Sequence, residues 1–83
     1  MKSELIELVN SKYNKCKSFQ DSKRTDYNVF PKDLEKATLI IEELKPFLVD
    51  ESITTINMSV RYEIDDYKIQ ILFSVPFGYK EIN

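Results

Sequence analysis

Apolar and polar residues alternate most regularly in the last third of the chain. The stretch INMSVRYEIDDYKIQILFSV, residues 56–75, places apolar residues at every second position on both sides of Asp65 and Asp66. A period of two predicts two antiparallel strands, about 53–64 and 67–77, joined by a turn at the two aspartates. In this register the facing apolar pairs are Ile64–Tyr67, Tyr62–Ile69, Val60–Ile71, Met58–Phe73 and Ile56–Val75. One face of the predicted hairpin is therefore apolar and has to be covered.

Two earlier stretches repeat apolar residues at helical spacing. The first helix is predicted over residues 4–19, and a loop rich in turn-favouring polar residues follows over residues 20–30. Pro31 suits the first position of a second helix, 31–48, because its missing N–H costs no hydrogen bond there. The apolar positions are Leu5, Ile6, Val9, Tyr13 and Cys16 in the first helix, and Leu34, Ala37, Ile41, Leu44 and Leu48 in the second. Pro46 predicts a kink or a break near the end of the second helix.

These elements predict a single small α+β domain over residues 1–83, with the element order α-α-β-β and a short tail at 78–83. The two helices would pack on one face of an antiparallel β-hairpin and cover its apolar side. A two-stranded sheet is marginal alone, and at least one long strand edge lacks a partner. Either residues 25–30 add a third short strand, or a second subunit pairs along the edge. We favour the second arrangement, a homodimer.

The composition indicates a small soluble protein of a reducing compartment. With 83 residues and a single cysteine, Cys16, the chain cannot form an internal disulfide, which fits a cytoplasmic location. No stretch approaches the roughly 18 apolar residues of a membrane span, and the N-terminus lacks a secretion signal, so no membrane role is expected. The preference for lysine, isoleucine and asparagine is typical of an AT-rich genome, such as that of a low-GC bacterium or one of its phages.

The absence of histidine argues against catalysis, because histidine is the usual general base and the commonest metal ligand. The carboxylates Glu63, Asp65 and Asp66 at the predicted turn lack the glycine and the ligand spacing of a calcium loop. Glu42 and Glu43 would point about 100° apart on a helix, so they are poorly placed to share a proton. We therefore expect no enzyme activity, no metal site and no cofactor.

Charge is unevenly distributed along the chain. The net charge is −2, yet residues 1–32 carry seven Lys/Arg and four Asp/Glu, whereas residues 33–83 carry five and ten. A small acidic domain can dock on a basic surface of another protein by electrostatic complementarity. The sequence therefore predicts a protein-binding or regulatory domain, such as an inhibitor, an immunity protein or an accessory protein of a phage or mobile element. The predicted contact residues are Glu42, Glu43, Asp65 and Asp66, with Leu72 and Phe77 as apolar anchors.

An alternative function is nucleic-acid binding through the basic segment 12–24. Its cations are Lys12, Lys15, Lys17, Lys23 and Arg24, with Tyr13 and Phe19 between them. Lysines can neutralise phosphates, and aromatic rings can stack on unpaired bases. Against this interpretation, both rings belong to the apolar stripe of the first predicted helix, and the chain as a whole is acidic with little arginine. The alternative therefore ranks second to protein binding.

Overall fold

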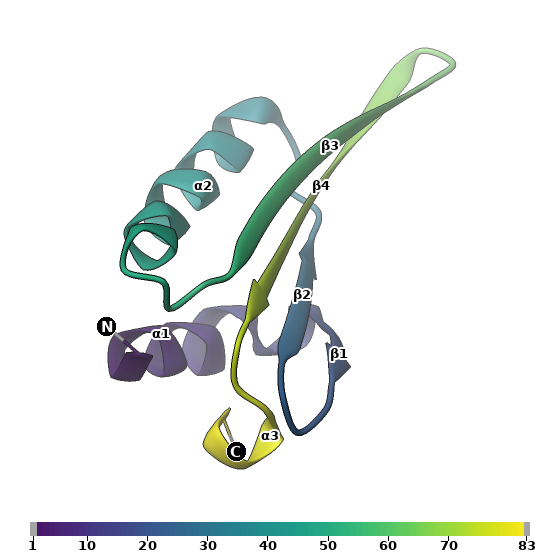
Figure 1. Ribbon diagram of the computed structural model, residues 1–83. Helices are drawn as coiled ribbons and strands as arrows, with labels where there is room; N and C mark the ends of the chain where they lie inside the picture. Colours follow the sequence, from purple (N-terminus) through teal and green to yellow (C-terminus); the bar gives the residue numbers. More distant parts are fainter. Residues whose placement is uncertain (1, 83) are drawn as a thin grey trace.

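The computed structural model describes residues 2–82, and side chains as far as residue 81. Its helical elements are α1 (Lys2–Leu8), the π-helical turn η1 (Val9–Tyr13), the 3-10 turn η2 (Asn14–Cys16), α2 (Leu34–Val49) and α3 (Tyr79–Ile82). Its strands are β1 (Lys17–Gln20), β2 (Thr25–Val29), β3 (Thr55–Glu63) and β4 (Asp66–Val75). The chain order is therefore α-β-β-α-β-β, followed by a short C-terminal helix (Figure 1).

The four strands form one antiparallel sheet in the order β1-β2-β4-β3. β4 lies in the interior of this sheet, with β2 on one side and β3 on the other. Phe73 of β4 faces Tyr27 of β2 and Ile56 of β3. β1 and β3 are consequently the two edge strands.

The core lies between the sheet and the helices. It contains Leu5, Val9 and Tyr13 from α1 and η1, Ala37 and Leu44 from α2, and Tyr27, Ile71 and Phe73 from the sheet. The ring of Phe73 stacks on Tyr27 with 4.9 Å between centroids, and the ring of Tyr13 meets it edge-on at 5.4 Å. Aromatic pairs in these geometries add stabilisation beyond the area that they bury. The centre of the core is thus over β2 and β4.

The predicted fold class, two helices on a two-stranded hairpin in the order α-α-β-β, is wrong. β1 and β2 replace the end of the first predicted helix and the predicted loop. In β2 burial has the period of two, since Thr25, Tyr27 and Val29 are buried and the residues between them are half-buried. Asp26 and Asn28 concealed this pattern because they favour turns. Residues 25–29 do add a strand, which is one of the two predicted alternatives, but β2 pairs with both β4 and β1, so the sheet has four strands and β3 remains at an edge.

The turn of the β3–β4 hairpin lies one residue earlier than predicted. Glu63 faces Asp66, so the loop is Ile64 and Asp65, and the register differs by two residues from the predicted one. A shift of two keeps every side chain on its expected face, because side chains alternate with the same period. Asp65 adopts the left-handed conformation, with φ of 63°. Aspartate tolerates this conformation better than most residues, which explains why the turn needs no glycine.

The N-terminal helical run is shorter than the predicted 4–19. Leu5, Val9 and Tyr13 recur every four residues and are buried. After α1 the chain continues through the wider π-helical turn η1, which contains Val9 and Tyr13, and then through the 3-10 turn η2, which ends at Cys16. Lys17 is already extended, with φ −61° and ψ 121°, and it begins β1.

α2 has a capped N-terminus and runs without a break through Pro46. Oδ1 of Asp33 caps the helix by accepting a hydrogen bond from the N–H of Lys36 at 2.8 Å. The predicted break at Pro46 does not occur, because α2 runs through this residue. Pro46 lies in the last turn, where its missing N–H removes one hydrogen bond, while its carbonyl still accepts from the N–H of Asp50 at 3.0 Å.

The hairpin extends well beyond the rest of the fold. In Figure 1 its tip rises past the N-terminal end of α2, and the molecule measures 42 × 23 × 20 Å along its principal axes. The side chains of residues 57–68 are all exposed. The far half of the hairpin is therefore outside the packed core, and it carries apolar side chains into a region where they lack cover.

Candidate functional site

A cluster of three side chains fixes the flank of α2 that faces η1. Oε1 of Glu43 accepts hydrogen bonds from the Tyr13 hydroxyl at 2.6 Å and from Nζ of Lys12 at 2.9 Å. Burial, together with the bond to Glu43, raises the pKa of Tyr13 well above its ordinary value. Partial burial by itself would raise the pKa of Glu43, but the hydrogen bonds from Lys12 and Tyr13 outweigh it and hold this pKa below its ordinary value. The cluster therefore holds α2 against η1.

The opposite flank of α2 is apolar and only partly covered. Leu34, Ile41 and Leu48 repeat every seven residues, so they lie along one line of the helix, on the far side from Glu43. Leu34 and Leu48 are exposed, and Ile41 is half-buried. Because η1 occupies the Glu43 side and α2 packs on β3 and β4, this line faces the β3 side of the sheet.

The row of β3 side chains on the covered face continues this apolar surface. Met58 is 50% exposed and Tyr62 is 82% exposed, with Val60 between them at the limit of exposure. The β4 partners of Met58 and Val60, by contrast, are buried beneath the helices. We call the exposed apolar set the β3 margin. It consists of Leu34, Leu48, Met58, Val60 and Tyr62.

The β3 margin lies beside a strand edge that is available for pairing. β3 pairs with β4, and within residues 2–82 no strand lies on its other side. In an antiparallel ladder every second residue directs its N–H and C=O away from the partner strand, so a nine-residue edge offers a row of free groups. Protein edges are usually protected by shortness, by proline or by inward charges. β3 is long and lacks proline, and its charged residues Arg61 and Glu63 face away from the helices.

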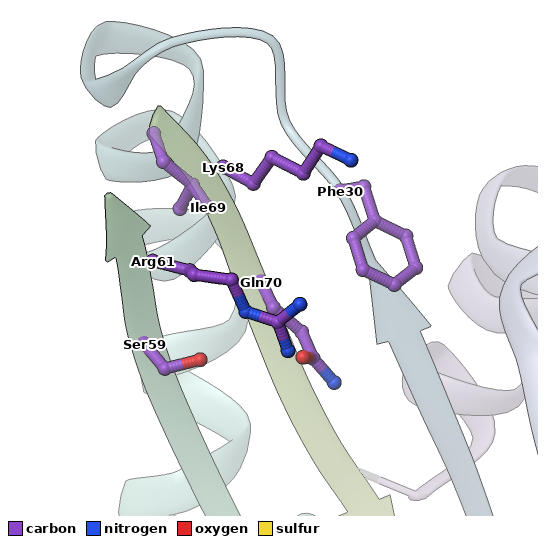
Figure 2. A pocket seen from close by; sticks show the side chains of 6 residues that line it. All are labelled: Phe30, Ser59, Arg61, Lys68, Ile69 and Gln70. Atoms are coloured by element: carbon purple, nitrogen blue, oxygen red, sulfur yellow. The ribbon is translucent and has the colours of Figure 1, made fainter. Parts of the chain in front are cut away.

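A second surface lies on the open face of the sheet, which no helix of the described chain covers. A hollow of about 240 Å³ there is lined by Phe30, Ser59, Arg61, Lys68, Ile69 and Gln70. Figure 2 shows that the side chains of Arg61 and Lys68 extend from neighbouring strands toward Phe30, which stands just beyond the end of β2. An adjoining hollow of about 450 Å³ shares Phe30 and Lys68 and reaches Lys32 and Tyr67. We call the first of these the cationic hollow.

The acidic residues predicted to contact a partner do not gather on one surface. Glu42 and Glu43 lie on α2, whereas Asp65 and Asp66 lie at the far tip of the hairpin (Figure 1). Glu43 is occupied by the cluster with Lys12 and Tyr13. The role of these carboxylates in binding stays a prediction, with Asp65 and Asp66 better placed than Glu43 because both are exposed beside the β3 edge.

The two predicted apolar anchors lie apart from these acids. Leu72 is half-buried on the open face of the sheet. Phe77 is 4% exposed, with the Lys2 ammonium 5.1 Å from its ring centroid, and its carbonyl accepts a hydrogen bond from the Thr25 hydroxyl at 3.0 Å. Phe77 thus contributes to the core near the C-terminus.

The basic segment 12–24 is spread over several elements. Lys12 lies on η1, Lys15 on η2, Lys17 on β1, and Lys23 and Arg24 in the turn between β1 and β2. Lys12 is paired with Glu43, and Tyr13 is buried in the core. Phe19 is exposed, and its ring stacks under the Arg24 guanidinium at 4.6 Å. These residues do not make one continuous basic face.

Sequence reasoning missed the residues that the structure brings together. The predicted loop 20–30 includes Phe30, and neither Arg61 nor Lys68 is among the predicted contact residues. The signal that could have revealed them is the row of polar residues on the second face of the hairpin, in which Arg61 and Lys68 fall opposite each other once the loop is placed correctly. Phe30 could not be located without β2.

Within residues 2–82, no helix is long and apolar enough to cross a membrane, and no group of His, Cys, Asp or Glu side chains is arranged to hold a metal ion. Comparison of the chain with protein-family models, with curated proteins and with solved structures gives no match. The candidate binding sites are therefore two surfaces, the β3 margin with its edge and the cationic hollow.

Proposed function

We propose that this chain is a non-catalytic protein-binding domain that acts by strand addition at β3. The observation that supports the proposal is the nine-residue edge, free within the described chain, beside the exposed apolar β3 margin. In strand addition the backbone hydrogen bonds supply affinity, and side chains at alternate positions supply specificity. An added strand would place its own apolar residues beside Met58, Val60 and Tyr62 and remove them from water.

The first occupant of this edge, when the chain is alone, is a second copy of the same chain. β3 is self-complementary, because a twofold axis at Ser59 places Met58 opposite Val60 of the second copy. On the other face the same axis places Asn57 opposite Arg61 of the second copy, which brings no like charges together. The two apolar margins then cover each other in one continuous eight-stranded sheet, the isologous arrangement that most homodimers use.

A partner protein with a strand of the same alternation would compete for the edge. The carboxylates of Glu63, Asp65 and Asp66 lie at one end of β3 and favour basic residues at the corresponding end of the incoming segment. This is how a small domain of this kind could occupy and inhibit, or recruit, another protein. The chemistry is binding alone.

The test compares two lysine substitutions on opposite faces of β3. Met58→Lys puts a charge on the apolar face, where pairing would bury it, whereas Thr55→Lys puts the same charge on the polar face of the same strand, opposite Glu63 of the second copy. Light scattering after gel filtration, over a range of protein concentrations, should give a dimer for the wild type and for Thr55→Lys, and a monomer of 9.8 kDa for Met58→Lys. A wild type that stays monomeric at all concentrations, or two variants that behave alike, would overturn the proposal.

A further inference from the structure

Two cations on the open face of the sheet lie opposite each other without full compensation. Arg61 of β3 and Lys68 of β4 are direct cross-strand partners, an arrangement that destabilises a sheet when the charges are alike. Nζ of Lys68 lies 3.7 Å from Oε1 of Glu63, and among the described residues Arg61 forms no ion pair. This surplus of positive charge occurs in a chain whose net charge is −2. A site that keeps two cations together in an acidic protein fits an anionic ligand.

An aromatic ring stands beside the two cations. Phe30 is 69% exposed, and Figure 2 shows its ring on the same side of the sheet as the Arg61 guanidinium and the Gln70 amide. Exposing a phenylalanine to water costs free energy, whereas covering its ring with a flat base would recover it. Phe30 occupies this place because Pro31 follows it and lacks an N–H, so that pairing between β2 and β4 ends at Val29 opposite Ile71.

Polar groups for a base edge lie beside the Arg61 guanidinium (Figure 2). Nε2 of Gln70 donates a hydrogen bond to Oδ1 of Asn28 at 2.7 Å. This bond orients both amides and leaves Oε1 of Gln70 as an acceptor and Nδ2 of Asn28 as a donor toward the open face. The hydroxyl of Ser59 lines the same hollow.

The same face carries a second exposed ring, on the other side of β2. Phe19 lies opposite Asp26, and the Arg24 guanidinium covers it with a distance of 4.6 Å to its centroid. Asp26 and Phe30 are four residues apart along β2 and its extension, which corresponds to roughly 13 Å. Because the Arg24 guanidinium covers the Phe19 ring and pairs with Asp26 at 3.2 Å, its outer face is the second surface on which a base can stack. Two stacking surfaces at this separation suit an extended strand better than one small anion.

We propose that the open face of the sheet binds single-stranded nucleic acid, with an unpaired base stacked on Phe30 and its phosphate held between Arg61 and Lys68. Duplexes are a poor fit, because their bases are already stacked on one another and cannot offer a face to the ring. The site is separate from the β3 margin, which lies on the opposite face of the sheet. It also differs from the basic segment 12–24, of which only Phe19 and Arg24 take part.

Fluorescence anisotropy with labelled oligo(dT) and oligo(rU) of about 12 nucleotides, within the usual site size of such surfaces, tests the proposal. The wild type should bind both single strands at low salt, and a duplex of the same length much more weakly. Two phosphate contacts predict that log K falls with log salt with a slope of about −1.4. Phe30→Ala should weaken binding about tenfold, and Arg61→Gln or Lys68→Gln should each weaken it and reduce the slope by about 0.7.

Matched controls separate this site from the rest of the molecule. Tyr62→Ala removes an even more exposed ring on the other face, and Lys45→Gln removes a cation from α2, so both should bind as the wild type does. Met58→Lys should also keep its affinity per chain, so this proposal and the strand-addition proposal can fail separately. Circular dichroism confirms that each variant is folded. Absence of single-strand binding at low salt, equal binding of the duplex, or an unchanged affinity of Phe30→Ala would each overturn the inference.

Discussion

β3 and β4 carry the same alternation of apolar and polar residues, yet their surroundings are opposite. On β4, Ile71 and Phe73 are fully buried, because β2 and β3 lie on either side of them and α1, η1 and α2 cover them. On β3, Met58 faces Ile71 across the ladder and is 50% exposed. Identical patterns thus give an interior strand and an edge strand. Alternation shows that a segment is a strand with an apolar face, but the number of neighbours is decided by the remaining segments of the chain.

The largest expected effect comes from truncating an apolar residue of the interior strand β4, compared with the same change on the edge strand β3. Phe73→Ala removes the ring that Tyr13 and Tyr27 contact, and it should cost about 3–5 kcal/mol of the free energy of unfolding. Met58→Ala should cost less than about 1 kcal/mol, because its side chain is half in water. Urea unfolding at one low protein concentration measures both, so that self-association does not enter the comparison. Equal losses would show that the edge row is as well packed as the interior one.

A smaller effect is expected from the cluster that holds α2 against η1. The pKa of Glu43 is lowered in the folded protein, so its ionised form contributes stability above the ordinary glutamate pKa. This contribution is present at neutral pH and is lost as the pH falls through the folded pKa. Glu43→Gln should therefore cost about 1 kcal/mol at pH 7, and this cost should shrink as the pH falls through the folded pKa. Glu42→Gln, at the exposed neighbouring position, serves as the control and should leave stability unchanged over the same pH range.

The smallest effect is expected from one of the two core tyrosines, whose hydroxyls differ in their partners. The Tyr13 hydroxyl donates to Glu43, so Tyr13→Phe should lose about 1 kcal/mol. Burial raises the pKa of Tyr27 to about 12, and within the described residues its hydroxyl has no hydrogen-bond partner. Tyr27→Phe should therefore leave the free energy of unfolding unchanged or raise it slightly. A loss larger than that of Tyr13→Phe would mean that the Tyr27 hydroxyl is bonded.

The hairpin and α2 were predictable because their periodicities extend over many residues. A two-residue error in the hairpin register did no harm, since both registers bury the same row of side chains. β1 and β2 were not predictable in the same way. They are four and five residues long, they contain residues that favour turns, and the pairing of β2 with β4 depends on contacts more than forty positions away in the sequence.

The candidate surfaces depended on β2 for the same reason. Without an internal strand beside β4, either edge of the hairpin could have been free, and Phe30 had no defined place. The predicted acidic contact residues failed to gather on one surface for another reason. The charge of a segment does not show which face its carboxylates occupy. Glu43 illustrates the point, since it is turned inward to Tyr13 and Lys12.

The two edges of the sheet offer the most direct test of the claim that β3 is the binding edge. β1 is also an edge strand, but it is short and has a register irregularity between Lys17 and Phe19. Backbone hydrogen exchange, followed by NMR at low and at high protein concentration, compares the two strands within one molecule. The account predicts that alternate amides of β3 gain protection as the concentration rises, while those of β1 exchange at the same rate throughout. Unchanged exchange along β3, or protection that appears on β1 instead, would contradict it.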